Sequence, residues 1–302
     1  MNGTHLHSVK FRAMGSPCEL IIHTSQDAGP ELLQLARDRL TQLEQKYSRY
    51  RPDSITTRIN AAAGTGETVP IDQETLGLLH YADSLHTQSK GLFDITSGVL
   101  RRAWDFRSAR LPEPKSIEAL LPSIGWRRVT WSQAGISLPT PGMELDFGGF
   151  VKEYAADQVA QRLRDSGVEH GLVNLGGDIV VIGPQPDGQP WRVGIRHPRQ
   201  ADTALLKLPM THGAIATSGD YERFMLIDGV RYCHLLNPFT GFPVHSPFAS
   251  ATVIADQCLI AGSFSSLTML TAETDPDWIT RVGLPYLLID QSMQVLSNME
   301  SR

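Results

Sequence analysis

The chain has 302 residues, of which 41% are hydrophobic and 20% are charged, and its formal net charge is −5. This composition is typical of a globular protein with a sizeable core, and the acidic balance excludes the basic surface that nucleic-acid binding needs. No apolar run approaches the length of a membrane span, so we also expect no membrane-spanning segment.

The N-terminal residues and the cysteines limit the location of the chain and its metal chemistry. Residues 1–7 lack the charged-then-apolar pattern of a signal peptide and carry no lipid-attachment cysteine. We therefore expect a cytoplasmic protein, or an exported one from which a leader has been removed. Cys18, Cys233 and Cys258 form no C-x-x-C pair, which argues against a zinc site and against a disulfide framework.

The first third of the chain predicts strands followed by two helices. Residues 9–24 are rich in strand-forming side chains, with an interruption at 14–17. Residues 29–46 repeat leucine and alanine at helical spacing, and residues 47–60 have the composition of a polar turn. A second helix is expected over residues 72–90, with an aspartate as its N-cap and a glycine after its end.

The middle of the chain is organised around a strand–turn–helix unit over residues 146–167. Its helix carries four apolar residues at helical spacing, Val151, Ala155, Val159 and Leu163. Before this unit, residues 107–140 are proline-rich and irregular, with one strand expected at 126–131.

The last part of the chain predicts mainly strands. They are expected within residues 171–183, which include a tight glycine turn, and at 191–195, 251–254 and 286–289. The segment 214–223 is expected to be a short strand that leads into a small polar loop, and 232–241 a strand that ends in a Pro/Gly turn. One buried helix is expected at 258–270. Because hairpins outnumber strand–helix–strand units, the fold class is α+β with largely antiparallel sheets, in one domain over residues 1–302.

Several glycine-rich turns each bring a polar residue to a strand end. The chain has no G-x-G-x-x-G, no P-loop and no H-E-x-x-H, and Ser218 does not lie in a G-x-S-x-G elbow. A helix that begins after Gly148-Gly149 offers free backbone N–H groups to an anion. An ordinary turn with a solvated Lys152 explains the same residues. Together the turns suit a cleft for a large phosphate-bearing ligand.

The order of the motifs carries a specific resemblance. They are Ala13-Met14-Gly15-Ser16, the segment 47–60, Gly91-Leu92-Phe93-Asp94-Ile95-Thr96, Leu145-Asp146-Phe147-Gly148-Gly149-Phe150-Val151-Lys152, Val173-Asn174-Leu175-Gly176-Gly177-Asp178, the segment 217–223 and His234-Leu235-Leu236-Asn237-Pro238-Phe239-Thr240-Gly241. In this order the chain resembles the FAD:protein FMN transferase family, often called ApbE-like, over roughly residues 10 to 290.

The resemblance implies a fold of two interlocked halves with a flavin cleft between them. It implies an enzyme that cleaves FAD at the pyrophosphate, passes FMN to a Thr or Ser hydroxyl of an acceptor protein and releases AMP, with Mg²⁺ as electrophile. His234 would transfer the proton of the attacking hydroxyl. The FAD site would be lined by Met14, Tyr50, Asn60, Leu92, Phe93, Asp94, Asp146, Lys152, Thr217, Ser218, Gly219, Asp220 and His234.

The chain departs from the family pattern at the metal site. There the family carries an Asp and a Thr on a C-terminal helix, which hold Mg²⁺ together with a carbonyl from the Gly-Gly turn. Here Gly262 and Ser266 stand in their places, so the remaining ligands would be the Gly149 carbonyl and the Ser265 and Ser266 hydroxyls. Because Mg²⁺ usually takes at least one carboxylate, binding should weaken unless Asp94, Asp146 or Asp220 substitutes.

Smaller departures lie at Asn237, where an Asp is common, and at Glu153, where a Gly is common. The sequence therefore leaves three functions open. The first is Mg²⁺-assisted FMN transfer, and the second is a catalytically silent FAD-binding protein that has lost the metal. The third is an FAD pyrophosphatase that uses water as acceptor.

Overall fold

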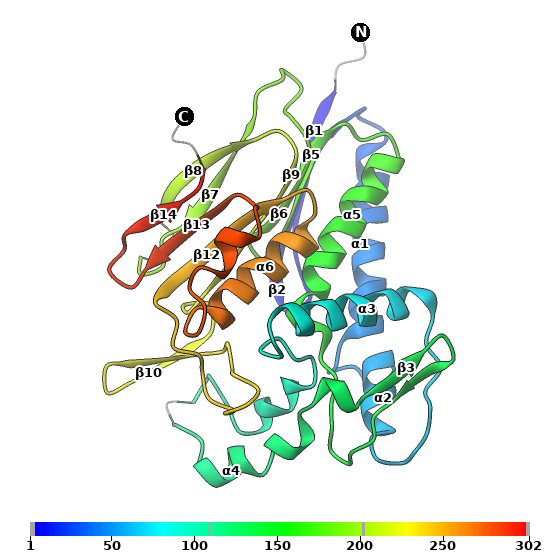
Figure 1. Ribbon diagram of the computed structural model, residues 1–302. Helices are drawn as coiled ribbons and strands as arrows, with labels where there is room; N and C mark the ends of the chain where they lie inside the picture. The colour runs from blue at the N-terminus through cyan, green and yellow to red at the C-terminus, as the bar shows by residue number, and fades with distance from the viewer. Residues whose placement is uncertain (1–3, 109, 201–202, 300–302) are drawn as a thin grey trace.

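The computed structural model describes residues 4–108, 110–200 and 203–299 (Figure 1). Its centre is an eight-stranded antiparallel sheet in the order β1-β2-β5-β6-β9-β12-β13-β14. The strands are β1 His5–Ala13, β2 Ser16–Thr24, β5 His170–Leu175, β6 Asp178–Gly183, β9 Gly213–Gly219, β12 Phe248–Ala255, β13 Tyr286–Asp290 and β14 Val295–Ser297. The predicted α+β class with antiparallel pairing is confirmed.

Three long helices cover one face of this sheet. They are α1 (Gly29–Tyr47), α5 (Val151–Asp165) and α6 (Cys258–Thr271). Helix α1 packs on β1 and β2, α5 on β5 and β6, and α6 on β9 and β12, with α5 between the other two (Figure 1). The leucine and alanine repeat in α1 is buried against α5 as predicted, which is the usual reason for an amphipathic helix to form in a globular protein.

The opposite face is covered by the β7–β8 ribbon, Trp191–Arg196 paired with Ala204–Met210. Side chains alternate between the two faces along each strand. In β6, Val180 packs into the helical layer, whereas Val181 packs against Val193 and Ile195 of the ribbon. Both faces of the sheet are therefore buried.

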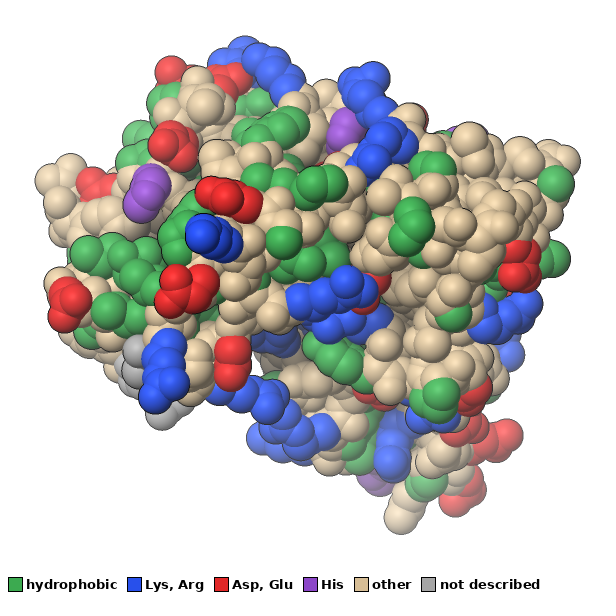
Figure 2. Space-filling view, turned by 90° about the horizontal axis from the view of Figure 1, so that it is seen from below, with side chains coloured by type: hydrophobic (Ala, Val, Ile, Leu, Met, Phe, Trp, Pro, Cys, Tyr) green, Lys and Arg blue, Asp and Glu red, His purple; other side chains and the backbone are tan. Residues whose placement is uncertain are grey.

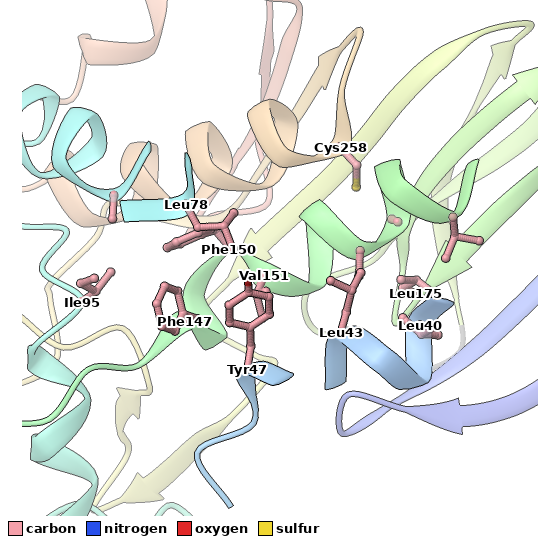
Figure 3. Close-up of a cluster of buried hydrophobic side chains, with 14 of the residues drawn as sticks. Leu40, Leu43, Tyr47, Leu78, Ile95, Phe147, Phe150, Val151, Leu175 and Cys258 are labelled. Atoms are coloured by element: carbon pink, nitrogen blue, oxygen red, sulfur yellow. The ribbon is translucent and has the colours of Figure 1, made fainter. Parts of the chain in front are cut away.

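A smaller set of elements lies below the sheet in Figure 1. It contains α2 (Ile55–Ala61), α3 (Gln73–Gln88), α4 (Pro114–Glu118), the β3–β4 hairpin (Thr130–Ser132, Gly135–Ser137) and the β10–β11 hairpin (Phe224–Ile227, Val230–Cys233). An aromatic cluster of Tyr47, Phe147 and Phe150 joins the N-terminal part of α5 to the end of α1 (Figure 3).

The sheet is built from two consecutive parts of the chain. Strands β1, β2, β5 and β6 come from residues 5–183, and β9, β12, β13 and β14 come from residues 213–297. The β6–β9 pairing joins these two sets, and α6 of the second set packs against α5 of the first. The halves therefore share one sheet and one helical layer.

Two local predictions were wrong. Residues 55–61 form a helix inside the segment expected to be a polar turn, because Ser54 caps the Thr57 N–H at 3.0 Å and Ile59 is buried in the core. The expected strand at 126–131 is a strand only from Thr130. The Trp126 N–H is bound instead to Asp94 Oδ2 at 3.0 Å, in a short 3₁₀ turn.

Some strands were not predicted. The structure adds β4, β8, β10 and the edge strand β14, which follows the strand expected to be the last. All three residues of β14 are exposed, so they lack the buried alternation by which a strand is found in sequence. None of the described helices is long and apolar enough to cross a membrane.

Candidate functional site

Segments far apart in the sequence meet at one end of the strands of the central sheet. The β1–β2 turn, the β5–β6 turn and the first turn of α5 lie together, because a Cβ on Gly176 would be 2.8 Å from Ser16 Cβ and 4.0 Å from Lys152 Cδ. The end of β9 lies beside them, where the Thr217 N–H points to Asp178 Oδ1 at 3.4 Å. Figure 2 looks at this end of the molecule and shows Lys and Arg side chains gathered along the middle of the face.

Lys152 stands at the centre of a small ionic cluster. Its Nζ forms an ion pair with Asp178, lies 3.1 Å from Glu153 Oε1 and donates to the Leu175 carbonyl at 3.3 Å. Burial alone would lower the pKa of Lys152, but the two carboxylates outweigh burial and raise it, so the lysine is charged. Burial raises the pKa of Glu153, and Lys152 offsets part of that rise. The cluster contains two carboxyl groups, those of Asp178 and Glu153, and one ammonium group, that of Lys152.

Asp146 has Arg49 as its ionic partner. The two side chains form an ion pair, and Asp146 also accepts the Gly148 N–H at 2.9 Å, which caps the Gly-Gly turn. Arg49 in turn donates to the Tyr50 hydroxyl at 3.0 Å and lies over its ring. Tyr50 is 77% exposed. The result is a large aromatic ring held in place at the surface, with a free face for another ring.

The loop before Asp146 is also fixed from within. Asn60 exchanges two hydrogen bonds with the Leu145 backbone, at 2.7 and 3.0 Å. Asp94 is buried, and its oxygens accept from Thr96 and from the Trp126 N–H. Both residues were expected to line the FAD site. In the structure they hold the backbone of site loops in place.

The predicted residues Leu92 and Phe93 lie beside the Gly-Gly turn. Phe93 is buried, and a Cβ on Gly149 would come within 3.1 Å of its ring. Leu92 is half-buried next to it in the chain and packs against the core. Gly149 is exposed. The close contact with Phe93 explains why the second glycine of the turn carries no side chain.

Met14 occupies the tip of the β1–β2 hairpin in a left-handed conformation, with φ of 50°. This conformation is uncommon for a residue with a side chain and needs support from its surroundings. Glu44 of α1 supplies it by accepting the Met14 N–H at 2.7 Å. The following Gly15 also has positive φ, as a two-residue hairpin turn requires.

The predicted segment 217–220 does not act as one unit. Thr217 Oγ1 lies 2.8 Å from Thr252 Oγ1, and Ser218 Oγ lies 2.8 Å from both Ser265 Oγ and Ser266 Oγ of α6. Gly219 is buried, with Tyr221 so close that a Cβ would clash at 2.4 Å. The hydroxyl groups of Ser218, Ser265 and Ser266 therefore form one connected cluster, whereas Thr217 pairs separately with Thr252 of β12.

Asp220 points elsewhere. It forms a two-fold ion pair with Arg199, at 2.6 and 2.8 Å, and accepts Gln291 Nε2 at 3.0 Å. The same carboxylate lines a recess of about 910 Å³ that also includes Arg231, Cys233 and His245. No polar contact of Asp220 with the α6 hydroxyl cluster is present among the described residues, so it is not positioned as a cation ligand there.

His234 follows β11. Its backbone N–H donates to the Arg223 carbonyl at 2.9 Å, and its ring Nδ1 is buried without a hydrogen-bond partner in the described part of the chain. Burial and the nearby Arg223 charge lower the pKa of His234 to about 4. The imidazole is therefore neutral at physiological pH and can accept a proton.

Comparisons with known proteins agree along nearly the whole chain. The ApbE family matches residues 14–288. A protein named FAD:protein FMN transferase from Vibrio cholerae is 31% identical over 253 residues, covering 82% of this chain and 75% of its own. Another from Treponema pallidum is 30% identical over 274 residues, covering 84% and 75%.

This chain belongs to the ApbE family. Solved ApbE structures show the same fold. The ApbE protein of Thermotoga maritima superimposes with a TM-score of 0.86 at 28% identity, with 97% of both chains covered. The flavinyl transferase ApbE of Pseudomonas stutzeri gives 0.85 at 29% identity, covering 98% of this chain and 95% of its own.

Gly262 stands where the sequence resemblance led us to expect a metal carboxylate, and the structure shows what surrounds it. Gly262 lies inside α6, and its carbonyl accepts the Ser265 hydroxyl at 2.9 Å. The described residues contain no group of three or more His, Cys, Asp or Glu side chains that could hold a metal. A cation here would therefore depend on hydroxyl and carbonyl oxygens with few carboxylates.

Two residues at the site were missed or undervalued from the sequence. Arg49 was placed only in a polar turn, yet it holds both Asp146 and Tyr50. Glu153 was noted only as a departure from a common glycine, yet it lies within the Lys152 cluster and against Gly262. The signal for Arg49 was its position beside an exposed tyrosine. For Glu153 the signal was that the chain departs from the family pattern at both Glu153 and Gly262, two residues that lie against each other in the structure.

Proposed function

We propose that this protein transfers FMN from FAD to a Thr or Ser hydroxyl of an acceptor protein and releases AMP. The relatives named FAD:protein FMN transferase support the class of reaction. The observation that carries the proposal for this chain is His234, whose Nδ1 is buried and has no hydrogen-bond partner among the described residues. Burial lowers the pKa of His234 to about 4, so this nitrogen is unprotonated at neutral pH and can accept a proton, although as a weaker base than an ordinary histidine.

In the proposed reaction, the acceptor hydroxyl oxygen forms a bond to the FMN phosphorus. The bond from that phosphorus to the bridging pyrophosphate oxygen breaks, and AMP leaves with that oxygen. His234 takes the proton of the hydroxyl. The exposed ring of Tyr50 would stack on a ring of FAD, and the exposed Gly149 backbone of the Gly-Gly turn would lie beside its phosphates.

A divalent cation would supply charge neutralisation at the pyrophosphate. The donors that fit it are hard oxygens: the connected hydroxyls of Ser218, Ser265 and Ser266 and one buried carboxylate oxygen, Glu153 Oε2, that has no partner among the described residues. This set is compatible with Mg²⁺ and gives the chain's own residues the task of holding it.

The test is to incubate the purified protein with FAD, Mg²⁺ and a protein that the Vibrio cholerae relative flavinylates. AMP release together with a covalently flavinylated acceptor supports the proposal. Free FMN and AMP without an acceptor product would indicate a pyrophosphatase instead. FAD that stays bound through purification and yields no AMP would indicate a silent FAD-binding protein, and the proposal would be wrong.

The pH dependence of transfer should report His234. Because its pKa is lowered to about 4, the base is already free at pH 6. We expect kcat/KM to stay level from pH 8 down to about pH 5 and to fall only as the pH approaches 4. An ordinary histidine would give a fall near pH 6.5. A pH–rate profile of AMP release measures this, and an acid limb near 6.5 would contradict the environment described for His234.

Tyr50 provides a separate test of FAD binding. Replacing Tyr50 by alanine should weaken FAD affinity roughly 5-fold, because stacking of one aromatic pair contributes about 1 kcal/mol. Tyr50→Phe keeps the ring and loses only the contact from Arg49, so it serves as the matched control. Fluorescence titration of FAD against both variants measures the difference. Equal affinity of the alanine variant and the native protein would exclude stacking on Tyr50.

A further inference from the structure

Gly262 and Glu153 fit each other. A Cβ built on Gly262 would lie 2.4 Å from Glu153 Cγ, 3.2 Å from its Cδ and 3.4 Å from its Cβ. The Glu153 side chain therefore fills the space that any side chain at position 262 would need. The sequence resemblance implies a metal carboxylate at position 262, and the Glu153 side chain lies where such a carboxylate would begin.

Glu153 itself has an unused oxygen. The residue is 8% exposed, and Oε1 is 3.1 Å from Lys152 Nζ. Its other oxygen, Oε2, is buried and has no hydrogen-bond partner in the described part of the chain. An unpaired buried carboxylate oxygen is costly, so such an atom points to a partner that binds there.

The charges in the cluster point the same way. Lys152 already has Asp178 as an ion-pair partner and the Leu175 carbonyl as an acceptor. Glu153 shares this ammonium with Asp178, so it has no ion-pair partner of its own. A cation beside Glu153 Oε2 would give that oxygen a partner, and the hydroxyls of Ser265 and Ser266 lie on the same helix as Gly262.

We propose that Glu153 supplies, from α5, the carboxylate ligand of the divalent cation that the ApbE motif otherwise supplies from α6. The two departures from the family pattern are then one exchange: the acid has moved from position 262 to position 153, and the glycine has moved the other way. The proposal rests on the proposed function for the identity of the cation. It concerns a ligand of that cation, and its test does not need turnover.

The first experiment measures Mn²⁺ binding to the full-length protein by calorimetry or by EPR of free Mn²⁺, without FAD turnover. Glu153→Gln keeps the size of the side chain and removes the negative charge, and it should raise the Kd for Mn²⁺ at least roughly 10-fold. Glu74→Gln is the matched control, because Glu74 is a partly buried acid ion-paired to Lys46 at 2.6 Å. The Kd of the Glu74→Gln variant for Mn²⁺ should stay near the native value. Circular dichroism confirms that both variants fold.

The second experiment reverses the exchange. Gly262→Asp alone should lose stability and bind Mn²⁺ poorly, because its Cβ collides with Glu153. Glu153→Gly with Gly262→Asp should relieve the collision and return Mn²⁺ affinity to within about 3-fold of the native protein. Weak Mn²⁺ binding by Glu153→Gln and by Gly262→Asp, with affinity recovered in the double variant, is not produced by a merely structural role for Glu153.

The outcomes separate this inference from the proposed function. If Glu153→Gln binds Mn²⁺ as tightly as the native protein, or if the native protein binds no Mn²⁺, the assignment of Glu153 is overturned whether or not AMP is released. If the exchange behaves as expected while FAD yields no AMP, the cation ligand stands and the transferase function fails.

Discussion

Replacing His234 by alanine is expected to slow FMN transfer by about 10²–10⁴-fold, the usual effect of removing a general base. His234 is unprotonated at neutral pH, because burial lowers its pKa to about 4, and its Nδ1 has no partner in the described structure, so this nitrogen is free to take the proton. The loss should appear in kcat far more than in KM for FAD, because proton transfer is needed only as the hydroxyl attacks. Single-turnover release of AMP, measured with saturating FAD and acceptor, gives the rate directly.

The control for this variant is His212→Ala. His212 is exposed on the β8–β9 turn, and its only described hydrogen bond is to Thr211. It should leave the rate unchanged. Exogenous imidazole that restores part of the rate to His234→Ala would support a role in proton transfer. An alanine variant that retains more than about a tenth of the native rate would remove His234 as the base.

Most of the elements at the site could be predicted because their signals are local. The repeat of Val151, Ala155, Val159 and Leu163 marks α5, and all four are buried as the spacing requires. The glycine turn at 176–177 has positive φ at both residues, which only glycine adopts freely. Period, caps and turn residues are properties of a few neighbouring positions, so a single sequence reveals them.

The partners of the site residues could not be predicted, because they come from distant segments. Asp146 was a candidate cation ligand, but its carboxylate is bound by Arg49, 97 residues earlier in the chain. Asp94 was another, but its oxygens are taken by Thr96 and Trp126. Whether an acid is free depends on what the fold brings to it. Sequence patterns carry no information on that point.

The same reasoning changes the meaning of Gly262. From the sequence, its missing carboxylate weakened the case for a cation and favoured a silent FAD-binding protein. In the structure, a carboxylate stands in the space beside it, contributed by a residue 109 positions earlier. A sequence motif describes residues of one helix, whereas cation binding depends on the oxygen atoms around the site, whichever helix supplies them.

Replacing Lys152 by methionine should destabilise the protein by about 3–5 kcal/mol at pH 8, because it leaves buried charge without its partner. Asp178 is 7% and Glu153 8% exposed, and both depend on the Lys152 ammonium. Methionine has nearly the length of lysine, so the loss reports the charge and not a cavity. Lys10→Met is the control, because the exposed Lys10–Glu19 pair should contribute less than about 1 kcal/mol.

The pH dependence of this loss decides its cause. Without the ammonium, the pKa of Glu153 in the folded Lys152→Met protein should lie still further above its unfolded value, so folding favours the protonated form. The folded variant then binds more protons than the unfolded chain, and its stability rises relative to the native protein as the pH falls from 8 towards 5. Urea unfolding in EDTA at both pH values measures this. A loss equally large at pH 5 would mean that packing of the lysine stem, and not its charge, holds the cluster together.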